Sequence, residues 1–264
     1  MDARLILAGL LLAATPTLSQ AFDHSHAAWD ALLRKHVVLL DGGKASQLDY
    51  AGMARDRVSL KAYLDSLSLV SHNEFETWPR GEQMAFLINA YNAFAVEKVL
   101  TRYPAIRSIW DFGKVFGNPF KDDFFTFVGG KRSLDAIEHA MLRPVFREPR
   151  VHYAVNCASI GCPMLREEAY LAARLDAQLE GQARRFLSDR SRNRYDARSG
   201  RLQVSRIFDW FAEDFEPRAR YFAAYADLLA DDAAGREAVR SGRAALQFLD
   251  YDWALNDSRS SSRR

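Results

Sequence analysis

The sequence predicts a mostly helical α+β protein, a single domain with a small antiparallel sheet and a functional site at a strand-to-helix turn. Two observations predict this fold class. Apolar residues recur at helical spacing in several long segments, whereas only short stretches alternate with the period of a strand. A third observation locates the site, because both cysteines of the chain, Cys157 and Cys162, lie between a predicted strand and a predicted helix.

The composition is that of an ordinary globular protein. Of the 264 residues, 48% are hydrophobic and 27% are charged, which is enough apolar material for a core. The net charge of +2 and the scattered arginines do not indicate a nucleic-acid partner, and we expect none. We also expect no cofactor. The length, without repeats or an internal linker, favours one domain over residues 22–257.

The N-terminal segment, residues 1–21, is typical of an export signal. Arg4 supplies a positive charge, residues 5–14 are an apolar run, and residues 19–21 form a small-x-small cleavage site. The run is too short to span a bilayer, and no later segment is long and apolar enough to do so. We therefore expect a periplasmic or secreted protein with no stable membrane insertion after the signal is removed, the alternative being a buried N-terminal helix. The polar tail, residues 258–264, is expected to be disordered.

The first half of the chain is predicted to be helical. Apolar residues three and four positions apart predict a helix over 29–40, which an Asp-Gly-Gly sequence ends, and another near 59–68. The longest predicted helix covers 82–100 and has a broad apolar face.

Three polar residues on this longest helix, Asn89, Tyr91 and Asn92, are candidate substrate-binding residues. A buried amide without a partner loses on the order of 1 to 3 kcal/mol, so the two asparagines require specific hydrogen-bond partners. Either they tie a neighbouring loop to the helix or they line a pocket.

A short strand over 124–128 and a tight turn are predicted next, followed by a helix over 133–143. Glu138 and His139 lie near the centre of this helix, and Pro144 is expected to stop it.

The segment 150–165 contains the predicted site. Residues 151–155 alternate as in a strand with one buried face, and this strand leads directly to Cys157. Cys162 precedes a helix predicted over 163–187, because proline is favoured at a first helical position.

The remainder of the chain is predicted to contain a hairpin over 194–205 and an aromatic segment over 207–215 that packs on the core. The last helices are expected to run to about Trp253.

Four segments together resemble one family: FLINAYNAF (86–94), SLDAIEHAMLRP (133–144), VHYAVNCASIGCPML (151–165) and IFDWFAEDF (207–215). In order and spacing they are similar to the domain-of-unknown-function 547 family (DUF547), over most of the chain from about Asp49 to Phe215. The resemblance implies an α+β domain of bacterial exported proteins and assigns no biochemical activity.

The first hypothesis for the site is a cysteine nucleophile, Cys157, in a hydrolase or an acyl-transfer enzyme. A thiol at a strand-to-helix turn can lie near helix N-terminal amides that lower its pKa. No histidine follows it, so a base must come from upstream. His139 is favoured because Glu138 and Asp135 are close to it in the sequence, while His152 could pack beside the thiol.

Further site residues follow from this hypothesis. Asn156, together with Asn89 and Asn92, could donate hydrogen bonds to a developing oxyanion, and Ser159 is a candidate substrate-binding residue. The alternative is that the histidine belongs to the core and the cysteine is structural.

A second hypothesis is a Cys157–Cys162 disulfide, structural or redox-active. The four intervening residues can bring the two Cα atoms within bridging range. Closing so small a loop would stabilise the fold by only roughly 2 kcal/mol. The same cysteines with His139 and His152 would suit tetrahedral zinc, but we expect no metal.

The last alternative is a non-enzymatic binding or envelope-interaction module. The aromatic segments 110–120 and 208–215 would then cover a ligand groove. The partner would be a small molecule or an envelope component whose identity the sequence does not indicate.

Overall fold

The computed structural model describes residues 21–113 and 117–259. The export signal predicted over 1–21 lies outside the described residues except for its last position, as do residues 260–264 of the predicted tail. No helix among the described residues combines the length and the apolar composition needed to cross a membrane.

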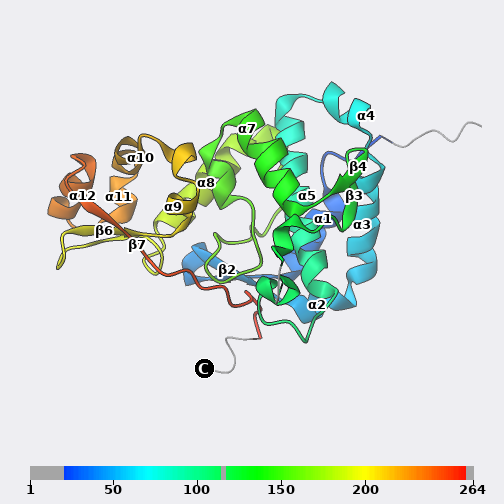
Figure 1. Cartoon of the computed structure of the whole chain (residues 1–264), viewed down its shortest axis with the longest axis horizontal. Helices are drawn as coiled ribbons and strands as arrows, with labels where there is room; N and C mark the ends of the chain where they lie inside the picture. Colours follow the sequence, from blue (N-terminus) through cyan, green and yellow to red (C-terminus); the bar gives the residue numbers. More distant parts are fainter. Residues whose placement is uncertain (1–20, 114–116, 260–264) are drawn as a thin grey trace, which may run out of the picture.

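Helices dominate an elongated molecule (Figure 1), so the mostly helical α+β prediction is confirmed. They are α1 (Ala27–His36), α2 (Tyr50–Arg55), α3 (Arg57–Leu69), α4 (His72–Thr77), α5 (Arg80–Leu100), α6 (Leu134–Ala136), α7 (Arg143–Phe146), α8 (Leu175–Leu187), α9 (Ile207–Trp210), α10 (Arg218–Ala224), α11 (Ala226–Leu229) and α12 (Ala233–Arg240). A π-helix (Ile137–Leu142) joins α6 to α7.

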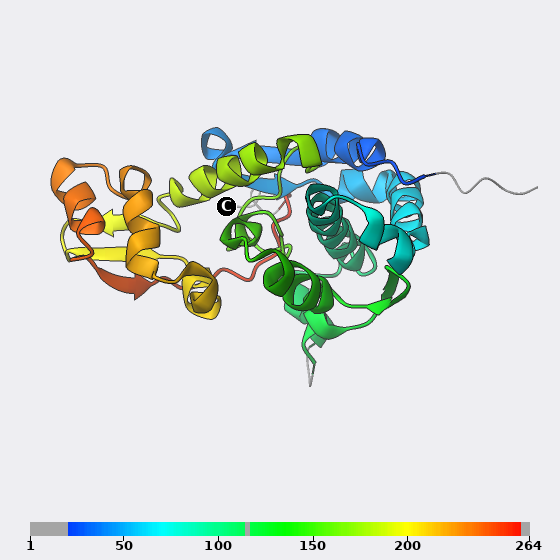
Figure 2. The ribbon, with the colours of Figure 1, turned by 90° about the horizontal axis from the view of Figure 1, so that it is seen from above.

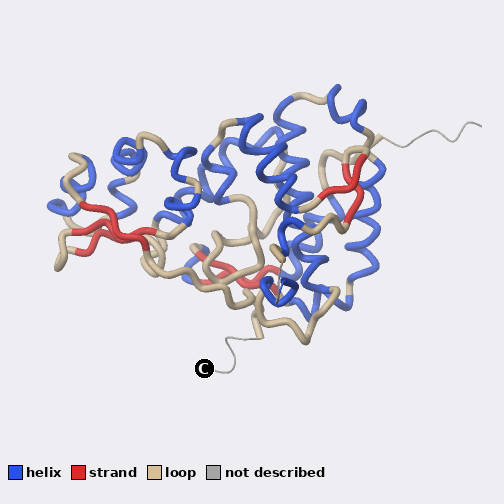
Figure 3. Tube along the Cα trace, viewed as in Figure 1, coloured by secondary structure: helices blue, strands red, loops and turns tan. Residues whose placement is uncertain are grey.

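The strands form small separate sheets, drawn as short red segments in Figure 3. They are β1 (Val37–Leu40), β2 (Ala45–Leu48), β3 (Phe125–Phe127), β4 (Gly130–Arg132), β5 (Arg194–Asp196), β6 (Arg201–Val204) and β7 (Ala245–Phe248). The pairs β1–β2, β3–β4 and β5–β6 are antiparallel, and β5–β6 is the hairpin predicted over 194–205, whereas β7 joins β6 in parallel.

The helix α5 is the centre of the larger hydrophobic cluster. Every residue from Met84 to Leu100 is buried, which is expected of a helix covered on all sides. Figure 2 shows α5 surrounded by other helices. A second cluster, which includes Phe186, Phe208 and Phe222, fills the space between α8 and the C-terminal elements. The elements β5–β7 and α10–α12 lie at one end of the molecule and α1–α5 at the other (Figures 1 and 2).

The prediction of a strand over 151–155 was wrong. Residues Pro149–Tyr153 form a 3-10 helix, and irregular structure follows. All of residues 151–156 are buried, so the alternation does not mark one buried face. The helix predicted from Pro163 was also placed too early, because α8 begins only at Leu175. The site therefore lies in a long loop before α8 instead of at a strand-to-helix turn.

Two element boundaries differ for local chemical reasons. Residues 37–40 were predicted as helix but form β1, because two adjacent valines favour a strand and β2 provides a partner. Pro144 does not stop its helix, which continues to Phe146 after the π-helical turn. Pro144 has no N–H to donate. The residue before it, Arg143, closes the π-helical turn through its N–H, which donates to the carbonyl of Glu138.

The end of the chain was predicted as helix to about Trp253, and this was wrong. After β7 the chain is irregular and returns to the larger part of the molecule (Figure 1). There the N–H of Leu48 in β2 donates to the carbonyl of Asn256 over 2.9 Å, and the N–H of Ser258 donates to the carbonyl of Leu48 over 3.1 Å.

Candidate functional site

Buried asparagine amides hold the loop that carries the cysteines. Asn92 of α5 donates through Nδ2 to the carbonyl of Ala154 (2.9 Å), and its Oδ1 accepts the N–H of Asn156 (2.8 Å). The side chain of Asn156 in turn donates to the carbonyl of Pro163 (2.8 Å) and accepts the N–H of Ala158 (2.9 Å). Side-chain amides thus satisfy backbone groups that a sheet would otherwise pair.

The returning C-terminal segment covers the same loop from another side. The N–H of Ile160 donates to the carbonyl of Ala254, and the N–H of Gly161 donates to that of Asp252, both over 2.8 Å. Gly161 is required by this close approach, since a Cβ there would lie 2.9 Å from two ring carbons of Tyr251. The contact places Tyr251 and Trp253 beside the cysteines.

The predicted disulfide between Cys157 and Cys162 is present, with the two Cα atoms 6.3 Å apart. Cys162 is buried, whereas Cys157 is half-buried. The Sγ of Cys157 lies 3.1 Å from Oγ of Ser159 and 3.3 Å from the hydroxyl of Tyr251, and Cys162 Sγ accepts the N–H of Cys157. Burial raises the pKa of Tyr251, so its hydroxyl remains a donor. The sulfurs therefore face hydrogen-bond donors.

A cavity of about 470 Å³ opens beside the disulfide. Among the described residues, seven phenylalanine, tyrosine and tryptophan side chains line it: Tyr91, Trp110, Phe120, Trp210, Phe211, Tyr251 and Trp253. The titratable groups that line it, besides the cysteines and Tyr251, are Tyr91, Asp135, Glu138, His139 and His152. A mostly apolar cavity of this size with a few convergent polar groups is typical of a small-molecule site.

Glu138 is the buried acid of this cavity, with its side chain 12% exposed. Burial raises the pKa of this carboxyl to about 7, although a hydrogen bond from Tyr91 and the positive charge of Arg143 act in the opposite direction. Glu138 can therefore release or take up a proton near neutral pH. Its Oε1 lies 3.8 Å from Nδ1 of His152.

His152 is held in one orientation by a carboxylate and a ring. Its Nε2 lies 2.6 Å from Oδ2 of Asp214, and its ring stacks on Phe211 with the centroids 4.1 Å apart. Burial lowers the pKa of the imidazole in spite of Asp214, so the neutral ring donates from Nε2 and keeps its lone pair on Nδ1. That Nδ1 is buried and has no hydrogen-bond partner among the described residues.

Asp214 remains ionised beside His152. Burial alone would raise its pKa, but hydrogen bonds from His152 and Arg143 hold it well below its usual range. Arg143 donates to Asp214 through Nε over 2.5 Å and to Glu213 through Nη2 over 2.7 Å. The imidazole therefore lies between a permanent carboxylate and a protonatable one.

His139 has one of its two expected neighbours, Asp135, and an unexpected one, Arg143. Its Nδ1 accepts a hydrogen bond from Nη1 of Arg143 (2.7 Å), and its Nε2 lies 3.8 Å from Asp135. Burial lowers its pKa. Glu138 was expected to orient His139 but approaches His152 instead, because successive residues of a helix point in different directions.

Residues 75–187 match the family model described as "Protein of unknown function, DUF547". Over this segment the chain is similar to that family. The match confirms the resemblance over a range that contains α5, the cysteine loop and α8. Comparisons with curated proteins and with solved structures gave no match.

The DUF547 segment supplies the predicted cavity residues, and other parts of the chain complete the site. The structure brings Tyr91, Glu138, His139, His152 and Cys157 to one cavity. The predicted site residues that do not line it are Asn89, Asn92, Asn156 and Ser159. Asn89 instead binds both backbone groups of Tyr170, which fixes a loop to α5.

Sequence reasoning missed Asp214, Tyr251 and Trp253 as site residues, all of which follow the DUF547 segment, whereas Trp210 belongs to the aromatic segment 208–215 that was expected to cover a ligand groove in a binding module. Asp214 and Trp210 belong to IFDWFAEDF, one of the four segments of the resemblance, and its acidic and aromatic residues were a usable signal. Tyr251 and Trp253 alternate with aspartates, a pattern of extended chain and not of helix.

A zinc site built from the two cysteines and two histidines is not assembled. No group of three or more histidine, cysteine or acidic side chains among the described residues is arranged to hold a metal ion. The cysteines are joined to each other, and the histidines are held by carboxylate and guanidinium groups.

Proposed function

We propose that the protein is a cysteine-dependent hydrolase or acyl-transfer enzyme, whose Cys157 thiolate forms when a dithiol reductant opens the Cys157–Cys162 disulfide. The observation that carries this proposal is that Cys157 lines the same apolar cavity as Glu138 and His152. A pocket that combines a nucleophilic atom with groups of altered pKa is the usual place for such chemistry.

Cys157 is the nucleophile in this proposal. It is the more exposed cysteine, so a substrate in the cavity can reach it. Hydroxyl groups of Ser159 and Tyr251 lie within hydrogen-bond distance of its Sγ and would stabilise a thiolate. Reduction supplies two electrons and two protons, and the reductant is oxidised to its own disulfide.

His152 and Glu138 carry the proton. The thiolate attacks the acyl carbonyl carbon, the bond to the leaving group breaks, and the leaving group takes a proton from Glu138 or protonated His152. Water or another acceptor then attacks the thioester and gives a proton to the same group. The carbon–sulfur bond breaks and the thiolate is restored.

A binding module is the second candidate, favoured by the closed disulfide. A bridged Cys157 has no thiolate, and the aromatic wall can hold a ligand without any reaction. An exported location, which residues 1–21 predict, fits both candidates because disulfides persist in oxidising compartments.

The two cysteine variants separate these candidates. We expect wild-type protein to hydrolyse members of a panel of aryl esters, thioesters and peptides only after treatment with dithiothreitol. Cys162→Ser leaves Cys157 unpaired, so it should be active without reductant. Cys157→Ser, the matched control, should be inactive in both conditions while unfolding at a similar temperature.

Equal activity of reduced wild-type protein and Cys157→Ser would contradict the nucleophile proposal. Absence of turnover by Cys162→Ser over the whole panel, with ligand binding retained by Cys157→Ser, would favour the binding module.

A further inference from the structure

We propose that the cavity binds an organic ammonium group of its ligand, between the partly exposed tryptophans of its wall and the carboxylates of Asp135 and Glu138. This inference names the substrate class of the proposed enzyme and in that respect rests on the proposed function. Recognition itself does not require turnover and can be measured separately.

Three tryptophans form one aromatic surface of the cavity. Trp210 and Trp253 stack with their ring centroids 5.6 Å apart, and Trp110 meets Trp253 edge to face at 5.3 Å. Trp110 is 37% exposed and Trp210 is 44% exposed, in contrast to the core aromatic residues, which are almost completely covered. Indole faces that are accessible from a cavity attract organic cations.

The charges of the cavity favour a cation over an anion. Asp135 and Glu138 line it, and no lysine or arginine does so among the described residues. The nearby guanidinium of Arg143 is paired with Asp214 and Glu213. An anionic ligand would therefore meet carboxylates without a free positive charge, whereas an ammonium group would be paired.

A buried acceptor gives an independent reason to expect an N–H donor. His152 is 4% exposed, and its Nδ1 has no hydrogen-bond partner among the described residues although the ring lines the cavity. A neutral imidazole nitrogen accepts one hydrogen bond, and a buried acceptor that lacks one is costly. A protonated amine can donate to this nitrogen while its charge is balanced by Glu138, 3.8 Å away.

The protonation state of Glu138 makes binding depend on pH. The titratable and charged groups that act on its carboxyl are Tyr91, Asp135, Arg143, His152 and Asp214. Burial raises its pKa to about 7, and a bound ammonium favours the carboxylate form. Binding should therefore strengthen as the pH rises through about 7 and should release a proton from Glu138.

The test is calorimetric titration of the oxidised full-length chain with benzylammonium chloride, which remains charged over this range, and with benzyl alcohol as its uncharged analogue. Because only the ionised carboxylate pairs with the cation, the dissociation constant of benzylammonium should be roughly tenfold lower at about pH 8 than at about pH 6. At the higher pH, benzyl alcohol should bind more weakly than benzylammonium does. Its own dissociation constant should not change with pH.

Variants assign the effect to the cavity. Glu138→Gln should remove the pH dependence, and Trp210→Ala, a change at a partly exposed side chain, should weaken binding at both pH values. Glu76→Gln, at an exposed position of α4 outside the cavity lining, should behave as wild type. Asp135→Asn, at the other lining carboxylate, provides a second measure of the charge effect.

Three results would overturn the proposal: no binding of benzylammonium, equal binding of benzyl alcohol at the higher pH, or an unchanged pH dependence in Glu138→Gln. In this experiment the disulfide remains closed and no turnover is measured. Failure of the ammonium proposal is therefore distinguishable from failure of the hydrolase proposal, which is tested by turnover of the cysteine variants.

Discussion

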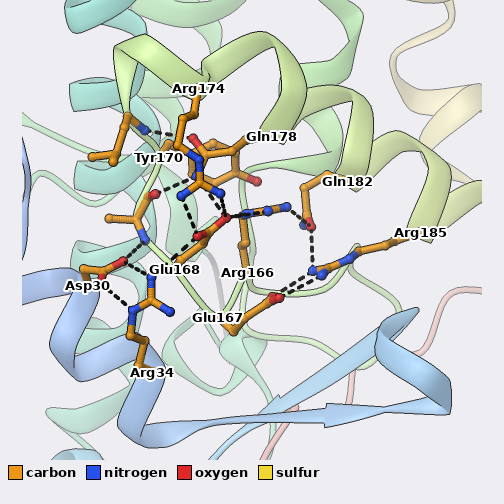
Figure 4. Close-up of polar contacts among 12 residues, drawn as sticks. Asp30, Arg34, Arg166, Glu167, Glu168, Tyr170, Arg174, Gln178, Gln182 and Arg185 are labelled. Atoms are coloured by element: carbon orange, nitrogen blue, oxygen red, sulfur yellow. Dashed lines mark hydrogen bonds and ion pairs between the residues drawn. The ribbon is translucent and has the colours of Figure 1, made fainter.

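Two buried glutamates of this protein are in opposite electrostatic environments. Glu168, 8% exposed, accepts hydrogen bonds from Arg166, Arg174 and Gln178 (Figure 4). Burial alone would raise its pKa, but these donors lower it to about 2. Glu138 is buried without direct cationic partners among the described residues, and its pKa is raised to about 7.

The difference separates a structural carboxylate from a reactive one. The Glu168 cluster joins α8 to the loop before it, and the adjacent Asp30 of α1 accepts the N–H of Ala169 (Figure 4). With this many donors, Glu168 has little capacity to exchange a proton. Glu138 remains protonatable near neutral pH and lines a cavity, the combination expected of a group that acts on a ligand.

The largest expected effect on stability is that of removing the Glu168 carboxylate. Glu168→Ala removes the carboxylate that pairs with the nearly buried Arg166 and accepts from the buried Gln178, and breaking such a cluster costs about 4 kcal/mol of the free energy of unfolding. Urea denaturation at neutral pH measures this loss, with Glu76→Ala on exposed α4 as the control. A loss no greater than that of the control would show that the cluster contributes little to stability.

Replacing Glu138, the acid of the cavity, should raise the free energy of unfolding relative to wild type as the pH increases, whereas replacing Glu168 should lower it. The pKa of Glu138 is raised from 4.5 to about 7, so its contribution to stability is complete below about pH 4.5 and is lost as the pH rises through about 7. That shift corresponds to roughly 3 kcal/mol. Glu138→Gln does not titrate and should gain this amount relative to wild type over the same range.

Urea denaturation of both proteins at a series of pH values checks this prediction. The difference between the two curves isolates Glu138, because all other titrating groups are common to both proteins. A difference that stays constant from acidic to slightly alkaline pH would contradict the raised pKa.

The sequence was sufficient for the fold class and for the elements with strong local signals. The helix α5 was predicted over 82–100 and observed over Arg80–Leu100, and β3 was expected close to its observed position. Local periodicity failed where buried side chains replace regular backbone pairing. Residues 151–155 alternate like a strand, but no strand among the described residues pairs with them. The side chains of Asn92 and Asn156 form hydrogen bonds with backbone groups of this loop instead.

The site was predicted in part, because spacing indicates which residues share a turn but not which turns meet. The cysteine spacing indicated Cys157, and the need for an upstream base indicated His139 with Glu138 beside it, whereas His152 was expected only to pack beside the thiol. The pairing of His152 with Asp214 depends on a contact across 62 positions, and Tyr251 reaches Cys157 across 94. The Tyr251 contact depends on the return of the C-terminal segment, for which sequence periodicity carried no signal that we used.

The smallest expected effect on stability is that of removing the exposed arginine of the Glu168 cluster. It shows whether the other donors are enough to stabilise the Glu168 carboxylate. Arg174 is on the rim, with its side chain 54% exposed, whereas that of Arg166 is 11% exposed. Arg174→Ala should therefore cost only about 0.5 kcal/mol, as is usual for exposed ion pairs. Arg166→Ala removes the buried partner of Glu168 and should cost roughly 2 kcal/mol more.

Salt distinguishes the two arginines further. Added sodium chloride screens exposed pairs, so the small loss in Arg174→Ala should shrink at high salt while the loss in Arg166→Ala persists. Both values come from urea denaturation of the two variants at low and high salt. Equal losses would mean that Glu168 depends on all its donors together. Loss of either donor would then be enough to destabilise Glu168. The contrast between Glu168, with more donors than it needs, and Glu138, without direct cationic partners among the described residues, would not hold.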